Sequence, residues 1–293
     1  MKCKKLVLFL LFLIISEGYS QGFLSLKLGA DSRTAALGMC GTVLNEYGST
    51  GYWNPAGLSF LKGRYLQFTH HRWIQGVRSN FLGYDQGGEK NSFGFHVLFT
   101  EVGGIEQRTV PSPEPESIFS FYELVLGFSY SRKIEDYLSL GLTLKGLAEK
   151  LHIEQAFAVA CDLGLQYELY KEKLRMGVAV QNLGRSGKLD KERIELPACL
   201  RLGVCYTDIF MGIRYRLLLD GVAEKKNVHI LGGGEITLNN IFSVRVGYQG
   251  GYKVKSITAG LGIEWNNIGI DYGYIPVKRG LGDSHRLTCR FTL

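Results

Sequence analysis

Few runs of this sequence carry side chains that catalysis or metal binding would need. His70 and His71 are adjacent, which would suggest a metal site if both rings faced the same way. Neighbouring side chains of a strand point to opposite faces, so we expect this pair to bind no ion. Gly232–Gly234 resembles part of a phosphate loop, but the lysine and the following helix are missing. We interpret these glycines as relief of crowding where a sheet bends or another segment approaches it.

The serines and histidines do not predict an enzyme. A hydrolase needs a serine, a histidine and an orienting partner that converge on one face. The 6 histidines are scattered along the chain, and none stands out as a general base. We therefore expect no catalytic residue, no metal and no cofactor.

The cysteines do not form a disulfide framework or a metal motif. Five of them follow the first 20 residues, and an odd number cannot be fully paired: Cys40, Cys161, Cys199, Cys205 and Cys289. Cys199 and Cys205 lie on one predicted strand about 20 Å apart, which is too far for a bond between them. No C-x-x-C pair is present. We expect these residues to be small apolar side chains on sheet faces.

The chain begins with the pattern of an export signal. Three lysines within residues 2–5 precede the continuous apolar run Leu6–Ile15, and Gly18 and Ser20 are the small residues that favour cleavage before Gln21. As a helix the run would reach about 15 Å, whereas a membrane-spanning helix needs about 20 residues. An uncleaved anchor is the alternative. The sequence predicts a signal peptide over residues 1–20 and an exported protein.

From Arg64 onward, apolar residues recur at every second position. In residues 138–145, four leucines alternate with serine, glycine, threonine and lysine, and residues 156–169 and 257–265 keep the same period. Successive side chains of a strand point to opposite faces, so each segment has one apolar face and one small or polar face. The pattern predicts an all-β protein.

Three features favour a transmembrane β-barrel over a soluble one. Many segments have the length that a tilted strand needs to cross a bilayer, and aromatic residues gather at their ends. Charged residues also fall on the face opposite the apolar one, where a hydrated lumen accepts them and a sandwich core does not. We predict that these charges face the lumen: Glu123, Lys145, Asp162, Arg175, Arg201, Arg214, Arg216, Arg245, Glu264, Asp271, Arg286 and Arg290.

We count about fourteen strands, and the connections between them alternate in length. The strands are predicted near 64–71, 79–85, 92–100, 118–130, 138–147, 156–169, 174–181, 197–206, 210–219, 228–238, 241–249, 256–265, 268–275 and 284–292. Short connections fall at 170–173, 207–209, 239–240 and 266–267, and long ones at 101–117, 182–196 and 276–283. Outer-membrane barrels have short periplasmic turns and long outer loops. The alternation predicts a closed barrel over residues 63–293 with both chain ends in the periplasm.

Residues 21–62 lack the strand pattern. Asp31 or Ser32 is placed to cap a short helix that Gly38 ends, and the run Trp53, Asn54, Pro55, Ala56 and Gly57 follows. About 40 residues are too few for a domain but suit a plug inside a barrel. We predict a hatch, with those five residues beside a possible ligand path. A plug that never moves is the alternative.

Two stretches of this segment resemble a known family. Residues 28–38 together with 52–58 are similar to the start of PorV/PorQ-type outer-membrane proteins, and Asn54-Pro55-Ala56 also marks the broader FadL-like barrels. Residues 181–184, 196–197, 260–274 and 285–287 extend the resemblance over most of the chain. It implies a fourteen-stranded barrel with an N-terminal hatch in the outer membrane of a Gram-negative-type bacterium.

The resemblance leaves transport and protein secretion open, and a structural surface barrel is a further alternative. FadL-like members carry hydrophobic compounds across the outer membrane, whereas PorV belongs to the type IX secretion system. The expected partners are outer-membrane lipid, the barrel-assembly machinery, and either hydrophobic small molecules or secreted proteins. The formal net charge is +7, but the basic residues are scattered singly, so we expect no nucleic acid partner.

Overall fold

The computed structural model describes residues 22–170, 173–189, 192–225, 227–252, 257–277 and 282–293. The predicted signal peptide lies outside these residues. No helix among them is long and apolar enough to span a membrane.

Fourteen antiparallel strands form one closed barrel, as the alternation predicted. Each strand pairs with its neighbours in the chain, and the first and last strands pair with each other, which leaves the barrel wall without an open edge. The strands are β1 Arg64–Arg72, β2 Arg78–Gln86, β3 Asn91–Gln107, β4 Ser117–Glu135, β5 Leu138–Leu151, β6 Glu154–Leu169, β7 Leu174–Ser186, β10 Cys199–Phe210, β11 Ile213–Glu224, β12 Asn227–Leu238, β13 Phe242–Gly250, β14 Ile257–Trp265, β15 Ile268–Pro276 and β16 Asp283–Thr292.

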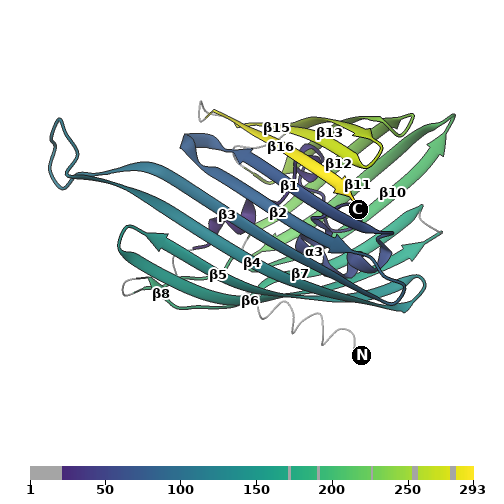
Figure 1. The fold of residues 1–293 in the computed structure, drawn as a ribbon, viewed down its shortest axis with the longest axis horizontal. Helices are drawn as coiled ribbons and strands as arrows, with labels where there is room; N and C mark the ends of the chain where they lie inside the picture. The colour runs from purple at the N-terminus through teal and green to yellow at the C-terminus, as the bar shows by residue number, and fades with distance from the viewer. Residues whose placement is uncertain (1–21, 171–172, 190–191, 226, 253–256, 278–281) are drawn as a thin grey trace.

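Three connections differ from the prediction. The expected loop at 101–117 is shorter than predicted, because β3 continues to Gln107 past an irregularity between Val102 and Ile105 and forms a long hairpin arm with β4, which begins at Ser117. Figure 1 shows this arm projecting beyond the rest of the barrel. The turn expected at 207–209 lies instead at Met211 and Gly212, whose positive φ angles make the hairpin. The connection after β7 also contains a small hairpin of β8 Lys188–Leu189 and β9 Glu192–Arg193, too short to leave an alternating pattern.

The two ends of the barrel are unlike each other. One end, the turn end, has the short turns, among them Asn239 and Asn240 with positive φ, together with the start of β1 and the end of β16. The other end, the loop end, has the hairpin arm, the β8–β9 connection and a short helix, η3 Ile74–Gly76, after β1. The carboxyl-terminal Leu293 donates its backbone N–H to the carbonyl of Arg64 at the turn end.

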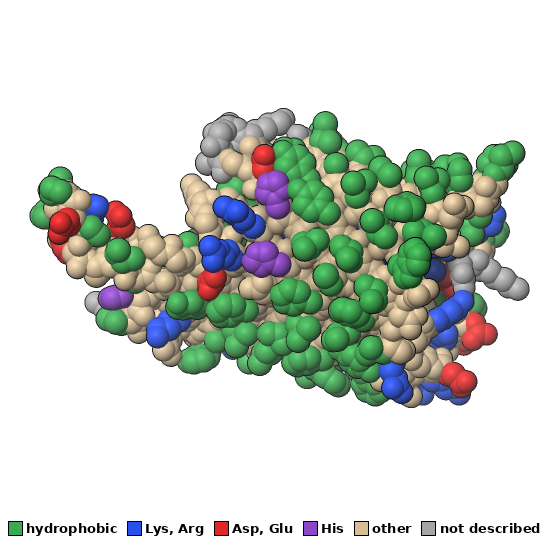
Figure 2. All heavy atoms as spheres, turned by 45° about the horizontal axis from the view of Figure 1, so that its top comes forward, with side chains coloured by type: hydrophobic (Ala, Val, Ile, Leu, Met, Phe, Trp, Pro, Cys, Tyr) green, Lys and Arg blue, Asp and Glu red, His purple; other side chains and the backbone are tan. Residues whose placement is uncertain are grey.

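The outer face of the wall is apolar and the inner face is polar. Phe128, Leu144 and Val246 are each more than half exposed on the outside, whereas their strand neighbours Ser129, Thr143 and Arg245 are buried. Figure 2 shows hydrophobic side chains over the middle of the barrel and charged side chains gathered toward its two ends. The period-two pattern thus places the apolar face outward and the polar face inward.

Residues 22–62, called the N-terminal segment from here on, lie inside the barrel (Figure 1). Its helices are η1 Leu24–Lys27, α2 Ser32–Ala36, α3 Thr50–Trp53 and η2 Pro55–Phe60. Asp31, one of the two predicted caps, accepts the backbone N–H of Thr34 at 2.7 Å, and Gly38 follows the helix with a φ of 69°. The α2 helix packs against β13 to β16, and η2 packs against β3 to β6.

Glycines on the inner face let the segment lie directly against the wall. A Cβ atom on Gly247 would come within 2.1 Å of the backbone nitrogen of Gly38, and one on Gly233 would meet the carbonyl oxygen of Leu37 at 2.7 Å. Gly233 is the middle of the Gly232–Gly234 run, so close approach of another segment is its structural role. Other inward glycines meet the segment in the same way: Gly83, Gly141, Gly164, Gly177, Gly203, Gly260 and Gly273.

We predict that Gly247→Val pushes α2 away from the wall, because the new side chain occupies the space of the Gly38 backbone. Overpacking of this kind costs about 1–3 kcal/mol. The midpoint of urea unfolding in detergent should fall, and limited proteolysis within residues 22–62 should become faster. Gly146→Val is the matched control, because a Cβ there meets nothing within 4 Å. Equal behaviour of the two variants would contradict this packing.

Candidate functional site

The five predicted hatch residues belong to the segment and lie inside the barrel, where α3 meets η2. Asn54 ends α3 and begins η2: its side-chain oxygen accepts the backbone N–H of Ala56 at 3.1 Å. Its amide nitrogen donates to the carbonyl of Thr42 at 2.9 Å. Pro55 occupies the first turn of η2, where its fixed φ suits the helix and its missing N–H costs nothing. The motif therefore fixes a bend that presses η2 against β5 and β6.

Gly57 and Trp53 mark two further close contacts of this bend. A Cβ on Gly57 would come within 2.5 Å of the Asn45 side chain. The Trp53 indole N–H donates to the Asp31 carboxylate at 2.8 Å, and the Arg201 guanidinium lies 5.1 Å from its ring centroid. The same carboxylate accepts the Ser49 hydroxyl at 3.0 Å. Asp31 thus joins the two helical parts of the segment around the Trp53 ring.

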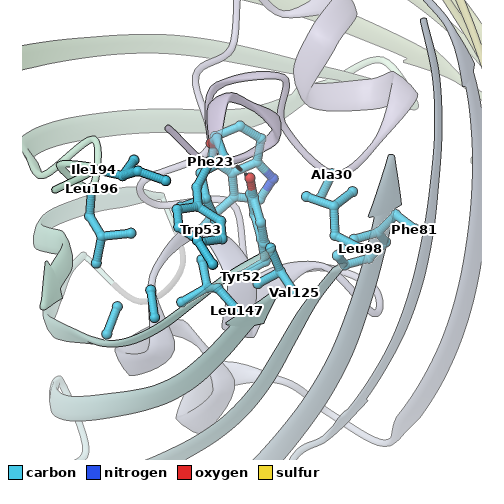
Figure 3. Packing of buried hydrophobic residues seen from close by; sticks show 14 residues of the cluster. Phe23, Ala30, Tyr52, Trp53, Phe81, Leu98, Val125, Leu147, Ile194 and Leu196 are labelled. Atoms are coloured by element: carbon cyan, nitrogen blue, oxygen red, sulfur yellow. Dashed lines mark hydrogen bonds between the residues drawn. The ribbon is translucent and has the colours of Figure 1, made fainter. Parts of the chain in front are cut away.

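Apolar side chains from the segment and the loop end pack around this tryptophan. In Figure 3, Phe23, Tyr52 and Trp53 lie together at the centre of the cluster, with Ile194 and Leu196 of the β8–β9 connection on one side and Leu98 and Phe81 of the wall on the other. All of these side chains are at most 7% exposed. This apolar cluster covers the segment toward the loop end.

A network of buried charges holds the segment to the opposite part of the wall. The Glu235 carboxylate accepts from Arg33 of the segment at 2.7 and 2.8 Å and from two wall residues, Arg216 and Arg245, at 2.6 Å each. Glu46 of the segment pairs with Arg33 at 2.7 Å and with Arg216 at 2.5 Å. Arg33 and Arg216 therefore each contact two carboxylates, Glu235 and Glu46. Buried guanidinium groups need such partners because they have lost their contact with water.

The network continues along the wall. Asp271 pairs with Arg245 at 2.6 Å and with Arg290 at 2.5 Å. The Arg290 guanidinium also lies 3.5 Å from the ring centroid of Tyr47, and the Tyr47 hydroxyl donates to Glu264 at 3.0 Å. Tyr47 is in the left-handed region with a φ of 79°, a conformation that its ring contacts and its hydrogen bond help to hold.

Two smaller polar groups lie inside the barrel: one links the segment to β10 and β11, and the other joins β5, β6 and β7. Arg201 and Asp220 pair at 3.1 Å, and Asp220 accepts both the backbone N–H and the hydroxyl of Thr42. Lys145 and Asp162 pair at 2.6 Å. Asn182, with a φ of 60°, donates its backbone N–H to Asp162 at 2.7 Å where the register of β6 and β7 shifts.

The twelve predicted lumen charges separate into two groups. Nine are buried inside the barrel: Glu123, Lys145, Asp162, Arg201, Arg216, Arg245, Asp271, Arg286 and Arg290. Arg175, Arg214 and Glu264 are half-buried at the turn end. Glu123 and Arg286 contact the segment itself, through Ser25 and the Leu28 carbonyl respectively.

Sequence reasoning missed several partners of these charges. Asp220 lies four residues after Arg216 on β11 and so points inward as well. Glu235 is directly opposite Arg216 and Arg245 on the neighbouring strands. The alternation of side chains could therefore have predicted that both carboxylates face the lumen. Arg33 and Glu46 lie in the segment, where no periodicity indicates which way a side chain points. Their role became visible only from the folded contacts.

The histidine pair and the cysteines do not form a reactive site. His70 is exposed and His71 is buried, so the two rings face opposite sides of β1. The five cysteines of the described chain are free thiols, and burial raises the pKa of the Cys40 thiol. Among the described residues, no cluster of histidine, cysteine or carboxylate side chains could hold a metal ion.

The space left beside Trp53 is small. A cavity of about 40 Å³ is lined on one side by Leu26, Met39 and Trp53 and on the other by Lys145 and Arg201. A water molecule occupies about 30 Å³ of liquid, so this cavity has no room for a hydrocarbon. Passage of a larger molecule beside Trp53 would require the segment to move.

The fold is similar to that of several hydrocarbon channels. Solved structures of the CymD monoaromatic hydrocarbon channel and the Pseudomonas putida toluene transporter TodX align with TM-scores of 0.66 and 0.61 at 13% and 14% identity. Each alignment covers 94% of this chain, with 99% of CymD and 98% of TodX. A Pseudomonas aeruginosa FadL homologue aligns at 0.57 and 11% identity, covering 90% of this chain and 98% of its own. At these identities the likeness shows the fold alone.

No family model and no curated protein sequence matches this chain. The structural comparisons support the fourteen-stranded barrel fold that the resemblance implied. Membership of the FadL-like barrels, and the narrower PorV/PorQ assignment, remain predictions.

We predict that Glu235→Gln weakens the barrel strongly, because Arg33, Arg216 and Arg245 then lose their shared carboxylate. Breaking a buried ion pair on one side costs about 3–5 kcal/mol. The free energy of unfolding in detergent should fall by about that amount. Glu106→Gln, which removes a half-exposed carboxylate from the hairpin arm, should change it by less than about 1 kcal/mol. Similar losses in both variants would contradict the network's role.

Proposed function

We propose that this protein is an outer-membrane barrel that lets hydrophobic small molecules cross past its N-terminal segment. The single observation that carries the proposal is the combination of a barrel like that of hydrocarbon channels with an interior filled by a polar-bonded segment. An apolar outer face of this kind suits a lipid bilayer. The short turns favour a periplasmic turn end.

This orientation places the carboxyl terminus and the start of β1 in the periplasm. The described chain begins elsewhere: the Gly22 backbone N–H donates to Glu195 in the β8–β9 connection, on the side of the loop end. From there the segment runs through the interior to Lys62 at the turn end. A molecule that crosses the barrel must therefore pass along almost the whole segment.

The contacts of the segment are of a kind that can be exchanged. Ion pairs and hydrogen bonds join α2 and the Asn54 bend to the wall, and water can replace such partners when it enters. By contrast, the apolar cluster around Trp53 gains from staying dry. We infer that the first movement opens the charged side near Glu235, while the Trp53 side acts as the hinge.

A second candidate is a non-enzymatic barrel in protein secretion, as the PorV/PorQ resemblance suggests. Two observations favour it: the cavity beside Trp53 is only about 40 Å³, and the β3–β4 arm projects far beyond the loop end (Figure 1). A filled barrel with an exposed arm suits docking of another protein better than conduction. Both candidates use the barrel without a catalytic residue.

Deletion of the gene separates the two candidates. If the protein is a channel, the deletion strain should take up a labelled monoaromatic or long-chain hydrophobic compound more slowly, and the full-length gene should restore uptake. Removal of residues 101–119, which form the exposed arm, should leave uptake intact. Uptake that is unchanged by the deletion would contradict the channel. Secreted proteins that then remain in the periplasm would support the secretion role, and normal surface display would contradict it.

A further inference from the structure

A cavity at the turn end is lined by basic side chains, which passage of hydrophobic molecules does not need. It has a volume of about 480 Å³ and lies between the inner faces of β7, β10 and β11 and Glu46 of the segment. Small-molecule sites commonly have about 300–1,000 Å³. We call it the turn-end cavity.

Four basic side chains converge on this cavity from neighbouring elements. Arg175 of β7 is opposite Cys205 of β10, and two residues further along β10, Thr207 is opposite Arg216 of β11. Arg214 is two residues before Arg216 and so shares its inward face. Lys173 lies just before β7, and its carbonyl accepts the N–H of Thr207 at 2.7 Å. The register of three strands therefore gathers the four cations at one place.

The counter-charges are unevenly distributed among these cations. Arg216 is held by Glu46 and Glu235, and Arg175 pairs with Glu168 at 2.9 Å. Lys173 pairs with Asp208 at 2.8 Å, but both side chains are well exposed, and such surface pairs contribute little stability. Arg214 forms no ion pair or hydrogen bond with any described residue. One guanidinium thus has no partner, and one ammonium has a partner that it can readily exchange.

We propose that the turn-end cavity binds the carboxylate or phosphate group of a small soluble anion. Arg214 supplies a planar fork of N–H donors that matches such a group, and Lys173 supplies a second charge from the neighbouring turn. Among the described residues of the lining, Ile209 is the only aliphatic one, so a purely apolar hydrocarbon gains little there. The site is thus distinct from a hydrophobic path, and it stands whether or not the barrel conducts hydrocarbons.

Calorimetry on the purified full-length protein in a neutral detergent tests this site. The probes are hexanoate, inorganic phosphate and neutral hexanol. Hexanoate, phosphate or both should bind, and hexanol should not. Binding of phosphate together with hexanoate identifies a general anion site, whereas binding of hexanoate alone identifies a carboxylate site. Binding of none of the probes, or equal binding of hexanol and hexanoate, would overturn the proposal.

Variants assign the binding to Arg214. Loss of one charge-assisted contact should weaken binding by about tenfold or more in Arg214→Gln. Arg214→Lys keeps the charge without the fork and should have an intermediate affinity. Arg132→Gln removes an exposed arginine from the same end, on the outer face shared with Leu140, and should bind like the unaltered protein. Equal loss in Arg214→Gln and Arg132→Gln would show unspecific attraction and sink the assignment.

The assay needs neither a membrane nor transport, so its failure is distinguishable from failure of the channel proposal. The heat-induced shift of the folded barrel on a detergent gel reports whether each variant is folded. If Arg214→Gln does not fold, Lys173→Met gives the second test, because Lys173 is exposed and outside the strands. The proposal would be overturned if two folded single variants, Lys173→Met and Arg214→Lys, both bound the anionic probes as tightly as the unaltered protein.

Discussion

The Glu235 carboxylate is the contact on which much of the interior depends. It accepts from Arg33 of the N-terminal segment and from Arg216 and Arg245 of the wall, all within 2.8 Å. Guanidinium groups inside a barrel are costly unless each finds an anion, and here a single carboxylate serves the segment and two strands together. The position of α2 and the register of β11 to β13 are therefore coupled: if the segment leaves, the wall loses part of its charge balance.

Two other features let this contact form. Inward glycines such as Gly233 and Gly247 bring the α2 backbone against the sheet, which puts the Arg33 side chain within reach of Glu235. On the far side, the apolar cluster around Tyr52 and Trp53 fixes the other half of the segment. The segment is thus held by exchangeable polar contacts on one side and by dry packing on the other. This asymmetry suggests a hinged movement better than complete expulsion.

Much of the wall followed from the sequence because side-chain direction in a strand has a period of exactly two residues. The fourteen strands and the inward phase of residues such as Arg245 and Asp271 come from that rule alone. The rule fails where a strand carries an irregularity, as at Val102 to Ile105, and where a hairpin is only two residues a side. Those connections were mispredicted because glycines and two-residue strands show no alternation of apolar and polar side chains in the sequence.

For a related reason, the sequence predicted the wall side of the candidate site but not the side that the segment contributes. Wall charges such as Arg216 could be assigned to the interior, but their partners in the segment, Arg33 and Glu46, could not. An irregular segment has no repeating geometry, so its side-chain directions depend on the finished barrel around it. The turn-end cavity is a further case, because it arises from the register of three strands that no local pattern specifies.

A reversible tether between segment and wall tests movement of the segment most directly. The Ser32 and Thr288 hydroxyl oxygens lie 2.8 Å apart, so cysteines at both positions, in a chain whose other cysteines are replaced by alanine, are placed to form a disulfide. Uptake of a labelled hydrophobic compound across the outer membrane would be measured with the disulfide oxidised and reduced. The account predicts that oxidation stops uptake and that a reductant restores it. In either single-cysteine chain, uptake should be the same under oxidising and reducing conditions. Equal uptake in the oxidised and reduced states would contradict a moving segment.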